Sequence, residues 1–301
     1  MEAVSPTYAL LAMQSGSHRL LDFRLFLNGN AATPAQVWEH VMARTNYQDI
    51  VRRNARRWEA MAPYRPGMTL AEHRAGVSAL GPEELSLLGD LAGKSVLHLA
   101  CSTCDEGITM ALAGASVVGV DISPTHVRIG HAKADALGAD VRIRVGDMMN
   151  LDNNLRDFDL AYISTGGICW VPDLDDWLAG VRKVLVPGGS LLISEHHPIW
   201  EIMGVVGERQ LAVLSDYFGE GNLPPLSDRS KWAGGAIETE GEDAVPWQYF
   251  VWGLGEVVSA LIRHDFEILA LLELPYPDMY RGLGEADGCV PAVYRLMAKC
   301  G

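Results

Sequence analysis

The chain has 301 residues, of which 49% are hydrophobic, and a formal net charge of −14 from 24 basic and 38 acidic residues. This composition is that of a globular protein with one large domain, or one domain and a lid. The negative charge argues against a nucleic acid partner, because a phosphate backbone would be repelled. No apolar run reaches the length of a membrane span, and residues 1–13 lack the basic start and apolar core of a secretory signal. We therefore expect a cytoplasmic protein without a membrane partner.

Residues 1–94 are expected to form an N-terminal helical cap. A capping-box pattern with proline at the first helical position predicts a helix over 33–45. A second helix is expected over 47–61, and Pro63 then interrupts the pattern. A third, short helix is expected over 81–93.

Residues 95–121 predict a strand, a turn of small residues, a helix and a second strand that ends at Asp121. In nucleotide-binding sheets an acid at this place accepts hydrogen bonds from ribose hydroxyls, and the small residues let a ligand approach the backbone. No glycine lies between Lys94 and Gly107. Because a pyrophosphate needs glycine at its closest approach, a nicotinamide-dependent reductase is a minor alternative.

Strands and helices continue to alternate as far as Ser194, which predicts a parallel sheet with helices on both faces. A helix and a closing antiparallel pair of strands are expected near the C-terminus. The segments are expected at 124–138 (helix), 158–162 (strand), 175–184 (helix), 191–195 (strand), 255–264 (helix), 266–274 (strand) and 293–299 (strand).

Residues 198–252 interrupt this alternation. The segment is rich in aromatic residues and carries nine acidic against three basic residues. Its length exceeds that of an ordinary connection, and its aromatic content argues against disorder. It is interpreted as an insertion that builds an acceptor pocket, with packing of the aromatic residues on the sheet as the alternative.

The order of these pieces resembles the class I S-adenosylmethionine-dependent methyltransferases. The most specific element is Pro187-Gly188-Gly189 before a strand, and Val145-Gly146-Asp147-Met148 is similar to the segment that flanks adenine. A closer likeness is to bacterial small-molecule, secondary-metabolite enzymes, through residues 169–177 and His197-Pro198. The resemblance covers about 94–199 and 250–300. The first motif departs from the family at four positions, which are His98, Ala100, Ser102 and Cys104.

The resemblance implies a Rossmann-like, mostly parallel seven-stranded sheet and S-adenosyl-L-methionine as cofactor. The methyltransferase domain would span 95–301, with 198–252 as its acceptor-site insertion. The residues expected to bind cofactor are Ala100, Cys101, Ser102, Asp121, Ile122, Asp147, Met148, Ser164 and Thr165.

Methyl transfer also needs an oriented acceptor and, for some acceptors, a base. His196 and His197 lie at the end of a strand and are the candidate catalytic residues. Trp170, Trp200 and Tyr217 are the candidate substrate-binding residues. Cys101 and Cys104 have no second Cys pair or nearby His pair in the sequence, so we expect neither a metal nor a redox role.

The leading function is therefore methyl transfer to a small, aromatic or apolar acceptor. The alternative is a non-methylating cyclase or cofactor-sensing protein on the same fold, which the four departures in the first motif keep open. The sequence does not decide whether nitrogen, oxygen or carbon is methylated. A homodimer is also left open.

Overall fold

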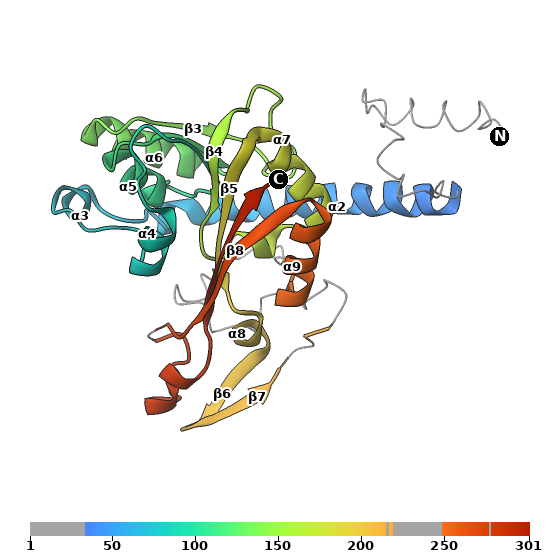
Figure 1. The fold of residues 1–301 in the computed structure, drawn as a ribbon. Coiled ribbons are helices and arrows are strands. Elements are labelled where there is room, and N and C mark those ends of the chain that lie inside the picture. The colour runs from blue at the N-terminus through green and yellow to red at the C-terminus, as the bar shows by residue number, and fades with distance from the viewer. Residues whose placement is uncertain (1–33, 215–216, 219–248, 277) are drawn as a thin grey trace. The chain divides into compact units, whose positions relative to one another are not determined.

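The computed structural model of this chain describes residues 34–214, 217–218, 249–276 and 278–301 (Figure 1). The chain divides into two compact units, 1–48 and 49–301. The second unit contains the sheet and every residue that lines the cavity described below. It also includes residues 49–94, which the sequence analysis placed in a separate cap.

The central sheet has seven strands in the order β3-β2-β1-β4-β5-β9-β8. The first five strands of this order are parallel, and β9 pairs antiparallel with both β5 and β8. The mostly parallel, Rossmann-like sheet that was predicted is therefore confirmed. The strands are β1 (Ser95–Leu99), β2 (Ser116–Asp121), β3 (Val141–Val145), β4 (Phe158–Ile163), β5 (Leu185–His196), β8 (Phe266–Leu274) and β9 (Val293–Cys300).

Helices cover both faces of this sheet, with α4, α5 and α6 on one side and α7 and α9 on the other (Figure 1). Alternation of side chains along β1 explains the two layers, because neighbouring residues of a strand point to opposite faces. Leu97 and Leu99 pack with Trp177 of α7, whereas Val96 packs with Ile108 of α5. The helices are α4 (Pro82–Leu88), α5 (Asp105–Leu112), α6 (Pro124–Leu137), α7 (Leu174–Val184) and α9 (Leu254–Arg263).

The N-terminal helices differ from their predicted limits. One helix, α2 (Pro34–Met61), replaces the two that were predicted, because neither glycine nor a further proline interrupts this stretch. A short helix that was not predicted, α3 (Leu70–Arg74), has a capping box between Thr69 and Glu72. Helix α4 ends early, at Gly89, whose φ of 60° suits glycine.

The described part of the 198–252 insertion begins with α8 (Pro198–Ile202) and a hairpin of β6 (Met203–Gly207) and β7 (Gln210–Val213). Residues 219–248, including Trp232 and Trp247, lie outside the described residues. Over the described ranges, every helix is too short or too polar to span a lipid bilayer. The remaining elements are the 3-10 helices η2 (Ala62–Tyr64), η3 (Ile168–Trp170) and η6 (Gly284–Cys289).

Candidate active site

A cavity of about 800 Å³ lies at the carboxyl ends of β1, β2, β4 and β5. Open parallel sheets bind their ligands at this edge. The cavity brings together twelve of the predicted site residues from five separate stretches of chain. They are Ala100, Cys101, Ser102, Asp121, Ile122, Asp147, Met148, Ser164, Thr165, Trp170, His196 and Trp200.

The loop after β1 keeps the backbone of a glycine-rich turn although it contains no glycine. Ala100, Ser102 and Cys104 have φ values of 47°, 49° and 60°. These are three of the four positions at which the sequence departs from the family pattern. A side chain in this left-handed region is strained, so the fold imposes the turn against the local preference of the residues. The turn directs backbone groups of this loop toward the cavity.

Asp121 is fixed at the end of β2 by two backbone amides. Ser102 N donates to Oδ2 at 2.7 Å, and Ser123 N donates to Oδ1 at 2.9 Å. His126 Nδ1 lies 3.6 Å from Oδ1. The carboxylate is therefore held in one orientation at the wall of the cavity, as a ligand for ribose hydroxyls requires.

Asp147 lines the same cavity beyond the end of β3. Met149 N donates to its Oδ1 at 2.9 Å, and burial, which is the larger influence, raises the pKa of this carboxyl. Ile122 and Met148 supply apolar side chains to the cavity wall. An adenine ring, with its apolar faces and its exocyclic amino group, fits this combination of residues.

The two cysteines of the β1 loop are buried: Cys101 is part of the cavity wall, and Cys104 lies beside His98. Cys104 Sγ lies 3.6 Å from His98 Nδ1, and His98 Nε2 lies 3.4 Å from Ser164 Oγ. A hydrogen bond from Cys101 is the largest influence that lowers the pKa of Cys104 to about 6, against burial and with help from His98. All five cysteines of the chain are free thiols. The pair therefore supports the loop through packing and hydrogen bonds.

Glu195 shapes the segment after β4, a role that the sequence did not indicate. Its Oε1 accepts from Gly166 N at 2.6 Å, and its Oε2 accepts from Ile168 N at 2.6 Å and from Cys169 N at 3.3 Å. This side chain is 3% exposed, and burial raises the pKa of its carboxyl. The segment that carries Thr165 and Trp170 is thereby folded against the end of β5.

His196 reaches the cavity from the end of β5. Its Nδ1 lies 3.3 Å from Glu201 Oε1 and 3.5 Å from Glu195 Oε1. Burial alone would lower the pKa of this imidazole, but Glu201 and Glu195 outweigh burial and raise it. The ring of Trp200 lies 4.6 Å away, measured between centroids, and closes the same end of the cavity.

His197, the second histidine predicted to be catalytic, does not line the cavity. Successive residues at the end of β5 point in different directions, and the His197 side chain caps α8. Its Nδ1 accepts from Ile199 N at 3.1 Å, and its Nε2 lies 2.8 Å from Glu273 Oε1. The prediction is thus corrected for His197, whose ring nitrogens both have structural partners.

Tyr217, predicted to bind substrate, also lies away from the cavity wall. Its ring packs with a separate apolar cluster that includes Tyr249 and Val251. Its hydroxyl accepts from Leu254 N at 3.4 Å at the start of α9. The structure therefore gives Tyr217 a packing role.

Comparison with known proteins agrees with this site. The family described as "Methyltransferase domain" matches residues 96–189. A crystal structure of an S-adenosylmethionine-dependent methyltransferase from Mesorhizobium loti is 25% identical and covers 71% of this chain and 94% of its own, with a TM-score of 0.55. The chain carries a class I S-adenosylmethionine-dependent methyltransferase domain.

Two further methyltransferases are similar over part of this domain or in fold. A demethylmenaquinone methyltransferase of Thermus thermophilus is 34% identical over 109 residues, which are 36% of this chain. The chain spans about half the length, 49%, of that relative. Geranyl diphosphate C-methyltransferase from Streptomyces coelicolor A3(2) shares the fold, with a TM-score of 0.50 and 14% identity over 72% of this chain and 77% of its own.

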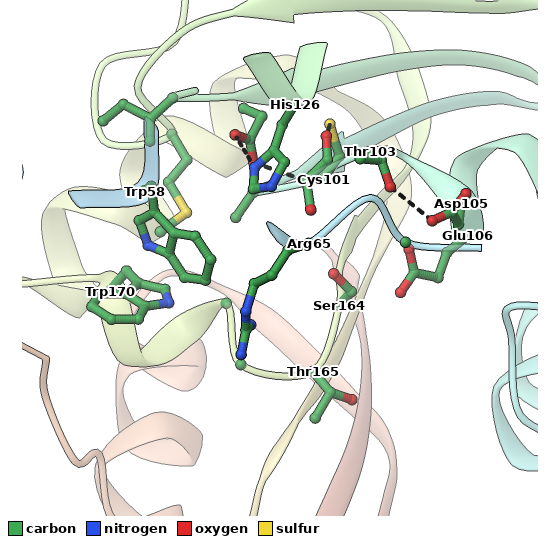
Figure 2. A pocket seen from close by; sticks show the side chains of 18 of the residues that line it. Trp58, Arg65, Cys101, Thr103, Asp105, Glu106, His126, Ser164, Thr165 and Trp170 are labelled. Carbon is green, nitrogen blue, oxygen red and sulfur yellow. Dashed lines mark hydrogen bonds and ion pairs between the residues drawn. The ribbon is translucent and has the colours of Figure 1, made fainter. Parts of the chain in front are cut away.

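The N-terminal part of the methyltransferase unit adds residues that the sequence analysis missed. Trp58, Arg65 and His126 all line the cavity. The Trp58 ring lies 5.5 Å from Trp170 and 6.0 Å from His126, between centroids. Figure 2 shows the Arg65 side chain extending past Trp58 into the cavity. Sequence patterns gave no signal for these residues, because α2 reaches the site only through tertiary packing.

Arg65 is a half-buried cation that stacks on an aromatic ring. Its guanidinium carbon lies 5.6 Å from the Trp58 ring centroid, and burial lowers the pKa of Arg65. Among the described residues, no carboxylate lies within ion-pair distance of it. Glu106, at the start of α5, lines the same cavity, and burial raises the pKa of its carboxyl. Arg65 and Glu106 are thus a cation and a carboxyl group in the wall of this cavity that a zwitterionic ligand could satisfy.

Helix α2 is attached to the start of α6 through Glu59. The Oε2 atom of Glu59 accepts from Ser123 Oγ at 2.6 Å and from Thr125 N at 3.0 Å, and its Oε1 accepts from Thr125 Oγ1 at 2.7 Å. Ser123 also caps α6, two residues after Asp121. Glu59 therefore links the helix that carries Trp58 to the part of the cavity wall that contains Asp121.

Proposed function

We propose that this chain transfers the methyl group of S-adenosylmethionine to a small acceptor with an aromatic or apolar body. The observation that carries the proposal is one cavity whose wall contains both the acids Asp121 and Asp147 and the side chains of Trp170, Trp200 and His196. A cofactor and an acceptor can therefore lie in the same space.

The residues present fit the cofactor. The left-handed turn at 100–104 and the fixed carboxylate of Asp121 suit its ribose, and the apolar wall beside Asp147 suits its adenine. Arg65 would hold the carboxylate of its methionine part, and Glu106 would accept from its ammonium group. When bound, S-adenosylmethionine supplies an electrophilic methyl group on its sulfonium sulfur.

At the acceptor end, Trp170 and Trp200 would pack against the acceptor, and Glu195 would hold the segment that positions Trp170. His196 Nε2 would take the acceptor's proton, because Nδ1 faces the two carboxylates. The names of the relatives support this class of acceptor: demethylmenaquinone and geranyl diphosphate both carry an apolar isoprenoid chain. A role of the protein in secondary metabolism and a homodimeric state remain predictions from the sequence.

The test is incubation with S-adenosylmethionine labelled at the methyl carbon and a panel of acceptors, read by mass spectrometry. The panel contains prenylated quinols, simple phenols, prenyl diphosphates and aromatic amines. A methylated product with at least one acceptor supports the proposal. Cofactor binding without any methylated product would favour the non-methylating alternative, a cyclase or cofactor sensor.

A further inference from the structure

Two His–Glu pairs lie next to each other at the end of β5, and only one of them faces the cavity. His196 pairs with Glu201 at 3.3 Å and lines the cavity, whereas His197 pairs with Glu273 at 2.8 Å and does not. The first pair is enclosed, since Glu201 is 5% exposed. The second is open to solvent at its carboxylate, since the Glu273 side chain is 53% exposed.

Glu195 and Glu201 both approach His196, but they have different tasks. The Glu195 carboxylate accepts from the backbone amides of Gly166, His196, Ile168 and Cys169. These hydrogen bonds commit the Glu195 carboxylate mainly to the segment after β4. Glu201 lies closer to His196 Nδ1, at 3.3 Å against 3.5 Å. Glu201 is therefore the carboxylate available to orient the imidazole.

A carboxylate at Nδ1 fixes the tautomer of a histidine. The proton stays on Nδ1, toward the carboxylate, and the lone pair stays on Nε2. In His196 this leaves the basic nitrogen on the side of the ring away from Glu201. Trp200, whose ring lies 4.6 Å from that of His196, limits rotation of the imidazole.

We propose that Glu201 is a positioning residue that holds His196 in the tautomer and orientation needed to accept the acceptor's proton. The inference rests on the proposed methyl transfer. In that step the acceptor lone pair forms the bond to the methyl carbon, and the carbon–sulfur electron pair remains on sulfur. The acceptor proton moves to His196 Nε2 and later to water. Glu201 stabilises the imidazolium that forms.

Two further titratable groups, Arg295 and Tyr280, act on this pair. Arg295 of β9 acts against the carboxylates and lowers the pKa of His196, but its effect is smaller than those of Glu195 and Glu201. Tyr280 lies near Glu201, and its pKa is raised by burial first and then by Asp287 and Glu201, so it stays neutral. The balance around His196 therefore depends mainly on its two glutamates.

The experiment compares Glu201→Gln with Glu273→Gln, the matched change in the neighbouring pair. Histidine NMR on ¹⁵N-labelled protein follows the tautomer and titration of each imidazole without any need for activity. We expect Glu201→Gln to shift the titration of His196 to lower pH and to weaken its preference for the Nδ1–H tautomer. Glu273→Gln should change only the His197 signals.

Turnover provides the second readout. We expect Glu201→Gln to lower kcat by about tenfold to a thousandfold and to move the midpoint of the kcat–pH profile to lower pH. Glu201→Asp, which keeps the charge, should recover part of kcat, and Glu273→Gln should keep the wild-type profile. If Glu201 acted through packing alone, Glu201→Gln would lower kcat without moving the midpoint of the kcat–pH profile.

The outcomes separate the two proposals. Unchanged His196 spectra in Glu201→Gln would overturn the pairing, and wild-type kcat at every pH in that variant would overturn the positioning role. Absence of methyl transfer with every acceptor would instead reject the proposed function, and the NMR comparison would still decide the pairing. If Glu201→Gln fails to fold, Glu201→Asp takes its place: its shorter side chain moves the carboxylate away from His196 Nδ1, so a smaller shift of the His196 titration and a smaller loss of kcat are expected, and wild-type values of both would overturn the proposal.

Discussion

Ser102 N donates a 2.7 Å hydrogen bond to Asp121 Oδ2, and this contact joins the loop after β1 to the end of β2. Residues 19 positions apart thereby form one wall of the cavity. The left-handed backbone of Ser102 points its amide at the carboxylate. The carboxylate that we propose as the ribose ligand is therefore oriented before any cofactor enters, which would reduce the entropy cost of binding.

The first prediction concerns this carboxylate. Asp121→Ala should weaken binding of S-adenosylhomocysteine by about 1.5–3 kcal/mol, because a charge-assisted hydrogen bond to ribose is lost. Isothermal titration calorimetry measures the change. The control variant is Asp135→Ala, because Asp135 is an exposed aspartate that does not line the cavity. Equal affinity of Asp121→Ala and wild type would contradict the placement of the ribose.

Arg65 gives a prediction that separates the two halves of the cofactor. Arg65→Met should lower the affinity for S-adenosylhomocysteine by about tenfold to a hundredfold, because the ligand carboxylate loses its cation. The affinity for 5′-methylthioadenosine, which lacks the amino acid part, should not change. Arg56→Met, at an exposed position on α2, is the control. An equal loss for both ligands would show that Arg65 acts only through the packing of Trp58.

The strained turn predicts a stabilising substitution. Ala100→Gly should raise the free energy of unfolding by about 0.5–1 kcal/mol, because relief of the left-handed strain exceeds the added entropy of the unfolded chain. Ala115→Gly should lower it by a similar amount, since Ala115 has no positive φ. Denaturant unfolding of the two variants supplies the comparison. The same sign for both would rule out strain at Ala100.

Replacing each of the two adjacent histidines by alanine should have a different effect. His196→Ala should lower kcat more than tenfold with cofactor affinity nearly intact. His197→Ala should reduce stability, because Glu273 and the start of α8 lose their partner, while kcat of the folded enzyme stays near wild type.

Because the pKa of His196 is raised, its neutral form increases as pH rises through that pKa. Wild-type kcat should therefore rise with pH with a midpoint above 6.5, and a midpoint below 6.5 would speak against His196 as the base.

Glu59 provides a prediction about stability and pH. Burial alone would raise the pKa of this carboxyl, but hydrogen bonds from Ser123 and Thr125 outweigh it, so the folded-state pKa lies below the usual 4.5. A lowered folded-state pKa contributes stability above pH 4.5 that is lost as pH falls through that folded-state value. Glu59→Gln should therefore flatten the decrease of the unfolding free energy below pH 4.5. Chemical denaturation at pH 3 to 7 measures this, and an unchanged slope would show that Glu59 does not contribute.

Cys101 and Cys104 are expected to be dispensable for cofactor binding. Cys101→Ser and Cys104→Ala should each keep the affinity for S-adenosylhomocysteine within about tenfold, because neither thiol is required as a ligand. Metal analysis of the purified protein should find no stoichiometric zinc. One zinc per chain, or a loss of affinity well beyond tenfold, would contradict this interpretation.

The sequence by itself determined the sheet and the position of Asp121 at the end of β2. Apolar runs of period two and helix starts such as Ser123-Pro124 are local signals, and they located β2, α6, β8 and Asp121 within a residue or two. Local signals did not separate His196 from His197, since both occupy the end of the same strand. The pleat of β5 and the position of α8 determine where each of these two imidazoles points and which carboxylate it contacts.

Tertiary structure alone decided the rest of the site. Arg65 and Trp58 reach the cavity because α2 docks on α6 through Glu59, a contact between residues 64 or more positions apart. The turn at Ala100, Ser102 and Cys104 holds a backbone conformation that these residues disfavour by themselves. Both features are maintained by packing between segments that are distant in the sequence. The energy of this packing exceeds the local conformational preference of the residues, and such packing produces no periodic pattern in the sequence.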